Sequence, residues 1–213
     1  MAVFDLEEQE QLDALKAWWK QWGNTVIYGV SALLIAIAGW QYWKNHTASQ
    51  AAEAAGHFES MNTALEGGDM KTAKEQAALL VDKFGGTPYA ARAAMLVASV
   101  NAQGKDARSA KAQLEWVVAN SKEAALRDVS RLRLAGLLLD EKDYEGALRQ
   151  LNAAHTDAYA PRFDDLKGDV YLAQGKTAEA RAAYSAAYAK LKDTNPLHGV
   201  VEMKLDSLGG PAK

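Results

Sequence analysis

The side chains that could carry chemistry are few in this chain, and their spacing predicts no catalytic or metal site. None of the four histidines belongs to an HExxH pattern, and no pair of them has the spacing of metal ligands. Glu53 and His57 lie four residues apart, which is typical of a solvated contact along one helix face. Asp164 and Asp165 are adjacent, but consecutive helical residues point about 100° apart, so these carboxylates do not form an acid–base dyad. Because cysteine is absent as well, we expect a protein that is not an enzyme and that holds no cofactor or metal.

The charge distribution argues against nucleic acid as a partner. The net charge of −3 comes from the first 20 residues, which hold five acids and two lysines. Residues 21–43 carry no charge, and residues 44–213 hold 22 Lys+Arg against 22 Asp+Glu. A balanced domain of this kind lacks the positive field that nucleic-acid binding requires.

Residues 21–43 form an uncharged, largely apolar run of 23 residues. A bilayer core about 30 Å thick needs roughly 20 such residues in a helix. Aromatic side chains cluster at both ends of the run, and indole and phenol rings favour the headgroup level. Trp22 and Trp40 are separated by about 27 Å along a helix, which fits one bilayer core. The run therefore predicts a transmembrane helix, with four anchoring residues: Trp22, Trp40, Tyr42 and Trp43.

Two other interpretations of this run explain less. A buried core helix does not account for aromatic residues gathered at both ends. A cleaved signal peptide requires a short basic segment before the apolar run, whereas the preceding residues here are mainly acidic. We therefore expect an uncleaved anchor. Lys16 and Lys20 before the run, against Lys44 after it, slightly favour an N-terminus in the cytoplasm and the larger domain outside.

Residues 5–20 have the pattern of a short amphipathic helix. Leucine and tryptophan recur on one helix face, at Leu12, Leu15, Trp19 and Trp22. This face predicts either a helix that lies on the membrane surface or a simple extension of the span. The sequence does not distinguish the two.

Residues 44–208 predict an all-α domain. No stretch alternates with the two-residue period of a strand, and the 36 alanines in residues 44–213 favour helices and their close approach. Seven breaking positions, together with Pro161 at the start of a helical pattern, divide the region into eight helices of about 13 to 20 residues and a short last one. They are Gly67-Gly68, Gly85-Gly86, Gly104, Asn120-Ser121, Lys142-Asp143, Gly175 and Asn195. The predicted domains are an acidic cytoplasmic segment (1–20), the transmembrane helix (21–43), the helical domain (44–208) and a tail (209–213).

A turn followed by alanine recurs four times in this domain. The alanines are spaced by 37, 37 and 33 residues, at Ala73, Ala110, Ala147 and Ala180. In three copies a small residue stands 12 positions earlier, at Ala98, Ala135 and Gly168. Two helices cross closely where small residues meet, so each copy predicts a helical hairpin. The pattern resembles the tetratricopeptide repeat, most clearly around Asp143-Tyr144-Glu145-Gly146-Ala147. That resemblance implies an α-solenoid of about four helix pairs, closed by a terminal helix at residues 195–208.

The order of these parts resembles one family. The specific pieces are the Gly39-Trp40-Gln41-Tyr42-Trp43 exit from the span, the Ala110-Lys111-Ala112-Gln113-Leu114 turn and the last helix with Met203-Lys204. They are similar to the ancillary SecYEG translocon subunit family (YfgM type) of Gram-negative bacteria. The resemblance implies a single-pass inner-membrane protein with a cytoplasmic N-terminus and periplasmic repeats. It also implies association with the SecYEG channel and with the membrane-anchored chaperone PpiD, and a role in handing unfolded secretory proteins to periplasmic folding factors. The alternative is a tethered adaptor in envelope stress signalling or cell-wall assembly, because a fold does not fix a function.

The candidate site is a surface. In tetratricopeptide folds the first helix of each pair lines a concave face, which implies a groove for an extended or helical segment of a partner. Counting back from each key alanine nominates Asn62, Arg92, Met95, Ser99, Leu132, Leu139, Arg162, Asp165 and Asp169. The other interpretation is that the leucines among them are buried core residues.

Overall fold

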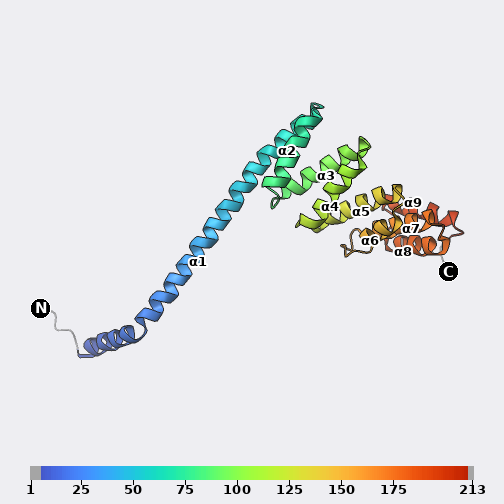
Figure 1. The fold of residues 1–213 in the computed structure, drawn as a ribbon. Coiled ribbons are helices and arrows are strands. Elements are labelled where there is room, and N and C mark those ends of the chain that lie inside the picture. Colours follow the sequence, from blue (N-terminus) through green and yellow to red (C-terminus); the bar gives the residue numbers. More distant parts are fainter. Residues whose placement is uncertain (1–5, 211–213) are drawn as a thin grey trace. The chain divides into compact units, whose positions relative to one another are not determined.

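A computed structural model describes residues 6–210 of the chain, and every regular element within that range is an α-helix (Figure 1). The fold is therefore all-α, as predicted. The helices are α1 (Leu6–Glu66), α2 (Met70–Lys83), α3 (Pro88–Gln103), α4 (Ala107–Asn120), α5 (Ala124–Asp140), α6 (Tyr144–Leu151), α7 (Ala160–Ala173), α8 (Thr177–Lys190) and α9 (Pro196–Ser207). The chain divides into two compact units, Met1–Gln50 and Ala51–Lys213, which are described separately below.

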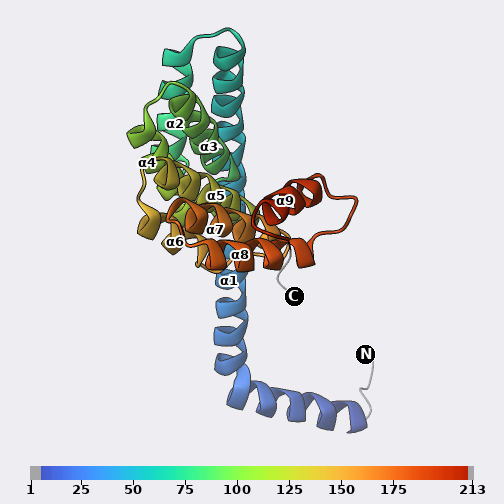
Figure 2. The same ribbon diagram turned by 90° about the vertical axis from the view of Figure 1, so that its right-hand side faces the viewer.

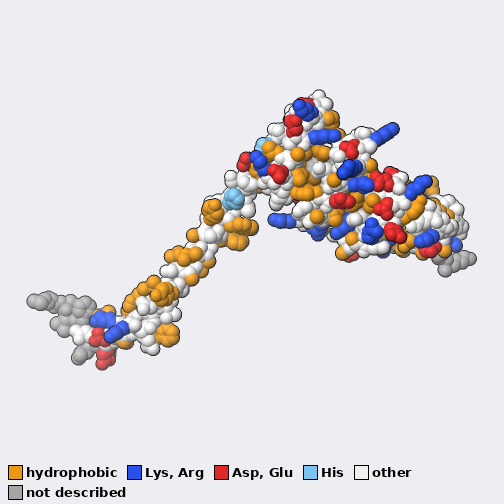
Figure 3. Space-filling view, in the orientation of Figure 1, with side chains coloured by type: hydrophobic (Ala, Val, Ile, Leu, Met, Phe, Trp, Pro, Cys, Tyr) orange, Lys and Arg blue, Asp and Glu red, His pale blue; other side chains and the backbone are white. Residues whose placement is uncertain are grey.

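A stretch of α1 that could cross a membrane begins in the first unit. Among the described residues, one helix is long and apolar enough to cross a membrane, and it is the segment from Gln9 to Glu66 within α1. Its large side chains are exposed: Trp22 is 48% exposed and Trp40 is 66% exposed. Figure 3 shows hydrophobic side chains along this helix. A core helix would be buried, so this exposure excludes the core-helix interpretation and fits a helix surrounded by lipid.

The helix shows no break at the predicted domain limits. Residues 6–66 form one α-helix, although the sequence analysis placed domain limits at residues 20 and 43. No proline occurs in this stretch, so the backbone has no strong reason to leave the helix. The limits therefore rest on composition alone and stay predictions.

The second unit is a row of helical hairpins formed by the end of α1 with α2, α3 with α4, α5 with α6, and α7 with α8, followed by α9 (Figures 1 and 2). The four key alanines are at most 1% exposed, which confirms that they lie inside the hairpins. Two of the small residues 12 positions earlier, Ala98 and Ala135, are buried as well. In the first hairpin Met61 stands at the corresponding position and is fully buried, so a larger side chain fills that crossing.

Helix α6 is shorter than predicted, with only 8 residues. The chain leaves the helix after Leu151 because the following loop has stronger partners elsewhere. The carboxylate of Asp128, which is 2% exposed on α5, accepts hydrogen bonds from the backbone N–H (2.9 Å) and hydroxyl (2.7 Å) of Thr156. His155 stacks on Phe163 with 4.1 Å between the ring centres. These contacts join residues far apart in sequence, so no local pattern predicts where α6 ends.

The turn between the two helices of each hairpin repeats in detail. The residues at positive φ are Gly68, Lys105, Lys142 and Gly175, and each is followed by the N-cap residue of the second helix. In the first three hairpins this N-cap is an aspartate whose carboxylate accepts a hydrogen bond from the backbone N–H three residues on, at 2.9–3.1 Å. In the fourth hairpin the N-cap is Lys176, which has the same backbone angles but no side-chain acceptor.

We predict that Lys176→Asp stabilises the protein by about 1 kcal/mol, because the carboxylate would accept the free N–H of Glu179 at the start of α8. The measurement is the unfolding midpoint of the full chain in detergent. Lys176→Ala is the matched control, since it removes the same lysine without supplying an acceptor. The cap explanation is wrong if the aspartate and alanine variants have equal midpoints.

Candidate partner-binding groove

A groove opens between α3, α4 and α5 in the second unit, with a cavity volume of about 270 Å³. We call it the α3–α5 groove, and define it by Ala98, Ser99, Ala102, Leu114, Arg133, Gly136, Leu137 and Asp140. The groove exists because the facing residues are small. Alanine and serine on α3 face glycine on α5, and no atom lies within 4 Å of a Cβ built at Gly136. The space between the two helices is therefore left unfilled by side chains.

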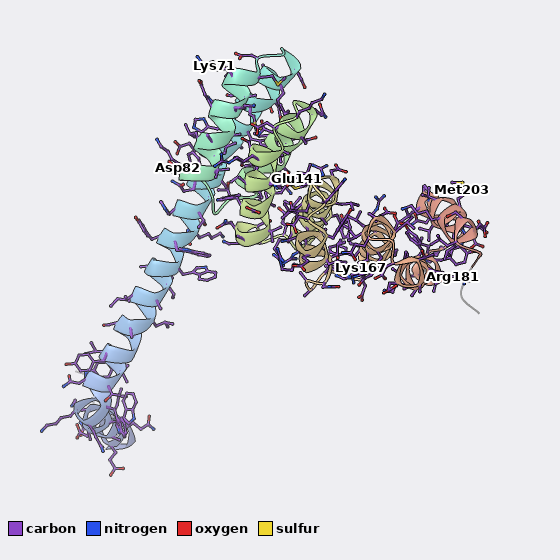
Figure 4. The ribbon with its side chains drawn as sticks, turned by 45° about the vertical axis from the view of Figure 1, so that its right-hand side comes forward. Lys71, Asp82, Glu141, Lys167, Arg181 and Met203 are labelled. Atoms are coloured by element: carbon purple, nitrogen blue, oxygen red, sulfur yellow. The ribbon has the colours of Figure 1, made fainter. Side chains whose placement is uncertain are left out.

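Two opposite charges flank the apolar part of the groove. Arg133 and Asp140 lie seven residues apart on α5, which is about 10 Å along a helix. Both are exposed, and neither has an ion pair or hydrogen bond to any residue between 6 and 210. By contrast, the adjacent Glu141, which is labelled in Figure 4, is paired with Lys111 of α4. Half-buried Leu137 supplies apolar surface between the charges, and Leu114, which is 1% exposed, lies beneath it at the floor of the groove. The arrangement suits a peptide segment with one apolar side chain between an acidic and a basic group.

The structure places the predicted groove residues in several different environments. Ser99 lines the α3–α5 groove. Asn62 is half-buried on the last part of α1, and Arg92 is exposed and forms an ion pair with Glu123 at 3.1 Å. Met95 is only 9% exposed and packs in a buried cluster with α4.

The two predicted leucines contact the core. Leu132 and Leu139 are half-buried and pack against the cluster that contains Ala135, Ala147 and Phe163. This is the environment expected under the core interpretation of these residues. Their role in binding a partner stays a prediction.

The predicted residues of the fourth hairpin, Arg162, Asp165 and Asp169, lie on α7, and both carboxylates already have a partner within the chain. Arg162 is exposed. The ammonium of Lys204, on α9, donates to Asp165 at 2.7 Å and to both oxygens of Asp169 at 2.7 and 2.9 Å. The hydroxyl of Tyr184 also donates to Asp169, at 2.7 Å. We call these four residues, Asp165, Asp169, Tyr184 and Lys204, the α7–α9 polar cluster.

Burial and charge shift the ionisation of this cluster. Burial raises the pKa of Asp165, and the hydrogen bond from Lys204 offsets only part of that effect. Burial alone would lower the pKa of Lys204, but its hydrogen bonds to the two carboxylates outweigh burial and raise it. Burial and the bond to Asp169 raise the pKa of the Tyr184 hydroxyl. The hydrogen bonds of the cluster join α9 to α7 and α8. The role of Asp165 and Asp169 in binding a partner stays a prediction.

The sequence analysis missed Arg133, Leu137, Asp140 and Lys204. Arg133 and Asp140 each lie one residue further along α5 than the predicted Leu132 and Leu139, and Leu137 lies between them on the same helix. Counting back from the key alanines follows a single face of each first helix. The groove is also lined by residues on a neighbouring face of α5, which this count does not reach. Lys204 lies 39 residues from Asp165, and no local signal relates the two.

The predicted anchoring residues are all exposed on α1: Trp22, Trp40, Tyr42 and Trp43. The rings of Trp40 and Trp43 are 5.7 Å apart, and Tyr42 stacks on His46 at 6.2 Å. Among residues 6–210, no three histidine, aspartate or glutamate side chains gather as metal ligands.

A helix able to span a membrane, followed by stacked helical hairpins, defines a membrane-anchored protein of the tetratricopeptide-like class. A family model described as "Tetratricopeptide repeat-like domain" matches residues 16–210, and the chain belongs to this family. No solved structure matches the chain.

Three curated relatives are each named "Ancillary SecYEG translocon subunit". The protein of Neisseria gonorrhoeae is 29% identical over 204 residues, which is 95% of this chain and 98% of the relative. The Escherichia coli protein is 28% identical over 211 residues, covering 98% and 99% of the two chains. The Haemophilus influenzae protein is 26% identical over 185 residues, covering 87% and 90%. The resemblance expected from the sequence motifs is therefore confirmed.

Proposed function

We propose that this protein is a non-enzymatic, ancillary subunit of the Sec translocon, held at the inner membrane by α1. The observation that carries the proposal is the likeness to three proteins of that name over nearly the full length, span included. Its support from the structure is the exposed apolar helix together with a hairpin domain, a fold that serves protein–protein contacts through long surfaces.

We further propose a cytoplasmic N-terminus and a periplasmic repeat domain. Lys16 and Lys20 precede the span and Lys44 follows it, which agrees with this orientation under the positive-inside rule. In this orientation the α3–α5 groove faces the compartment into which secretory chains emerge.

In our proposal the repeat domain links the channel to the periplasmic chaperone PpiD and assists the handover of unfolded secretory proteins. Tethering raises the local concentration of the domain near the channel exit, so a weak interaction suffices. A groove with one apolar site and two flanking charges is suited to such weak and reversible binding, because it captures a short segment without burying a large surface.

The partner is expected to enter the α3–α5 groove. A photo-reactive residue in place of Ala102, at the edge of the groove, should form crosslinks to PpiD or to unfolded secretory proteins in native membranes. Gly136→Leu should reduce these crosslinks about tenfold, a loss of about 1.4 kcal/mol, because its side chain occupies the space between α3 and α5. Gly136→Ala is the matched control, since a single methyl group meets no atom within 4 Å and leaves most of the groove open. Arg133→Glu should weaken the same crosslinks by reversing one flanking charge.

If Gly136→Leu and Gly136→Ala give equal amounts of crosslinked product, the partner does not bind in the α3–α5 groove. The same strains test the orientation, because protease added to spheroplasts must digest a periplasmic repeat domain. Protection of the domain would reverse the proposed topology.

A further inference from the structure

The first part of α1 carries an apolar face that no residue of the described chain covers. On a helix of about 100° per residue, its five large apolar side chains fall within an arc of about 120°. They are 47–60% exposed: Leu12, Leu15, Trp18, Trp19 and Trp22. The rest of the helix surface carries the charged residues Lys16, Lys20 and Asp13. Separation of this kind is the pattern of a helix that lies at a boundary between water and an apolar phase.

Helix α1 bends near its N-terminal end, and both ribbon views show this (Figures 1 and 2). Sharp bends in helices have local causes, most often proline or glycine. The first 28 residues contain no proline and one glycine, Gly23, which directly follows the apolar face. A Cβ atom at Gly23 would lie 3.2 Å from the indole of Trp19, so the indole packs over the bare glycine backbone. We attribute the bend to this contact.

We propose that residues 12–22 lie in the plane of the membrane, with their apolar face in the headgroup–acyl boundary, and that the bend at Gly23 turns the chain into the span. The occupant of the apolar face is the lipid of the same bilayer that the span crosses, because the face leads directly into the span at Trp22. Three indoles in one arc fit this depth, where the ring is apolar and its N–H reaches water.

The charges of the segment specify which lipid feature is recognised. The proposed segment, residues 12–22, holds Asp13 against Lys16 and Lys20, so its formal net charge is +1, and Glu10 just before it brings the total to zero. Binding is therefore driven by apolar contact with the boundary and does not depend on anionic headgroups. This distinguishes the segment from basic amphipathic helices, whose attachment weakens in neutral lipid or high salt.

The test uses the full chain, which contains no cysteine, so single cysteines accept a nitroxide label cleanly. Labels are placed on the apolar face by Leu15→Cys and Trp18→Cys, and on the polar face by Asp13→Cys and Ala17→Cys. Each variant is reconstituted in vesicles of pure phosphatidylcholine, and power saturation compares the access of oxygen with that of a water-soluble nickel chelate. The expected result is high oxygen and low nickel access at residues 15 and 18, and the reverse at residues 13 and 17.

High accessibility of all four labels to the water-soluble nickel chelate would overturn the proposal, because the helix would then project into water or require a protein partner to cover it.

A second measurement tests the bend. Labels at Ala14→Cys and Ser31→Cys would lie about 26 Å apart along a straight helix. A clearly shorter distance supports the bend at Gly23, and the straight-helix distance contradicts it.

A third measurement tests the driving force. The access of oxygen and of the nickel chelate to each label should stay the same when anionic lipid or high salt is added. Loss of contact with the headgroup–acyl boundary in high salt would contradict an apolar driving force.

Discussion

Gly168→Ala is expected to destabilise the repeat domain by about 3 kcal/mol, a large effect for one methyl group. A Cβ at Gly168 would lie 2.2 Å from Cε1 and 2.4 Å from Cδ1 of Tyr184. The ring cannot easily move away, because Tyr184 is 1% exposed and its hydroxyl is bonded to Asp169. Relief of the clash therefore requires α7 and α8 to separate. Unfolding of the full chain in detergent, followed by circular dichroism, measures the loss.

Gly136→Ala is the control for helix propensity, since it also introduces a methyl group into the middle of a first helix. Its Cβ meets no atom within 4 Å, and alanine is the better helix former, so we expect a neutral effect or a gain of up to about 1 kcal/mol. In a protein that also carries Tyr184→Ala, the substitution Gly168→Ala should cause little further loss of stability, because the ring that clashes with the new methyl group is gone. If Gly168→Ala and Gly136→Ala behave alike, the close crossing of α7 and α8 is not as described.

Lys204→Met is expected to destabilise the protein by about 3 kcal/mol at pH 7, because it leaves two carboxylates of the α7–α9 polar cluster without their cation. Asp165 and Asp169 both lie within 2.7 Å of the same ammonium, and their side chains are only 14% and 31% exposed. Methionine keeps the length and apolar stem of lysine, so the loss isolates the charge. The measurement is again the unfolding midpoint of the full chain.

The loss should depend on pH in a defined direction. In Lys204→Met, burial and the neighbouring charge of Asp169 raise the folded-state pKa of Asp165, and only the charge of Arg162 still opposes them. A raised carboxyl pKa gives stability below the unfolded value and loses it as the pH rises through the folded value. The variant should therefore recover part of its stability between pH 7 and pH 4. Adding Asp165→Asn to the variant should restore stability at pH 7, and failure of both recoveries would contradict the ionic account of the cluster.

In the unaltered protein, Lys204 and Tyr184 give the stability a pH dependence on the alkaline side. The pKa of Lys204 is raised above its usual 10.5, so the stability from its ammonium is fully present below that value. It is lost as the pH rises through the folded-state value. Deprotonation of Tyr184 is disfavoured in the fold and acts in the same direction.

The sequence predicted those parts of the fold that repeat along the chain. Buried alanines that recur every 33 to 37 residues, such as Ala110 and Ala147, are a local pattern, because each hairpin must bring small residues to its crossing. The breaking positions are local as well, since Gly68 and Gly175 supply the positive φ that the turn requires. The early end of α6 was missed because it depends on Asp128, 28 residues before Thr156.

The site was less predictable than the fold for a physical reason. A groove depends on two helices and on the distance between them. The α3–α5 groove exists because Ala102 and Gly136, which line it, have small side chains that leave the space between the helices unfilled. Local periodicity identified the helices but not which of their faces remain apart. The same limit applies to Asp165 and Asp169. Their type suggested a partner surface, whereas the fold brings Lys204 onto both of them.

The central claim is that the span holds this hairpin domain at the Sec channel. Its most direct test is photo-crosslinking in native inner membranes from a reactive residue in place of Gly29, which has open space around it within α1. The account predicts adducts that contain a subunit of the SecYEG channel. Adducts with only a cell-wall synthase or a stress sensor, and none with a channel subunit, would contradict it.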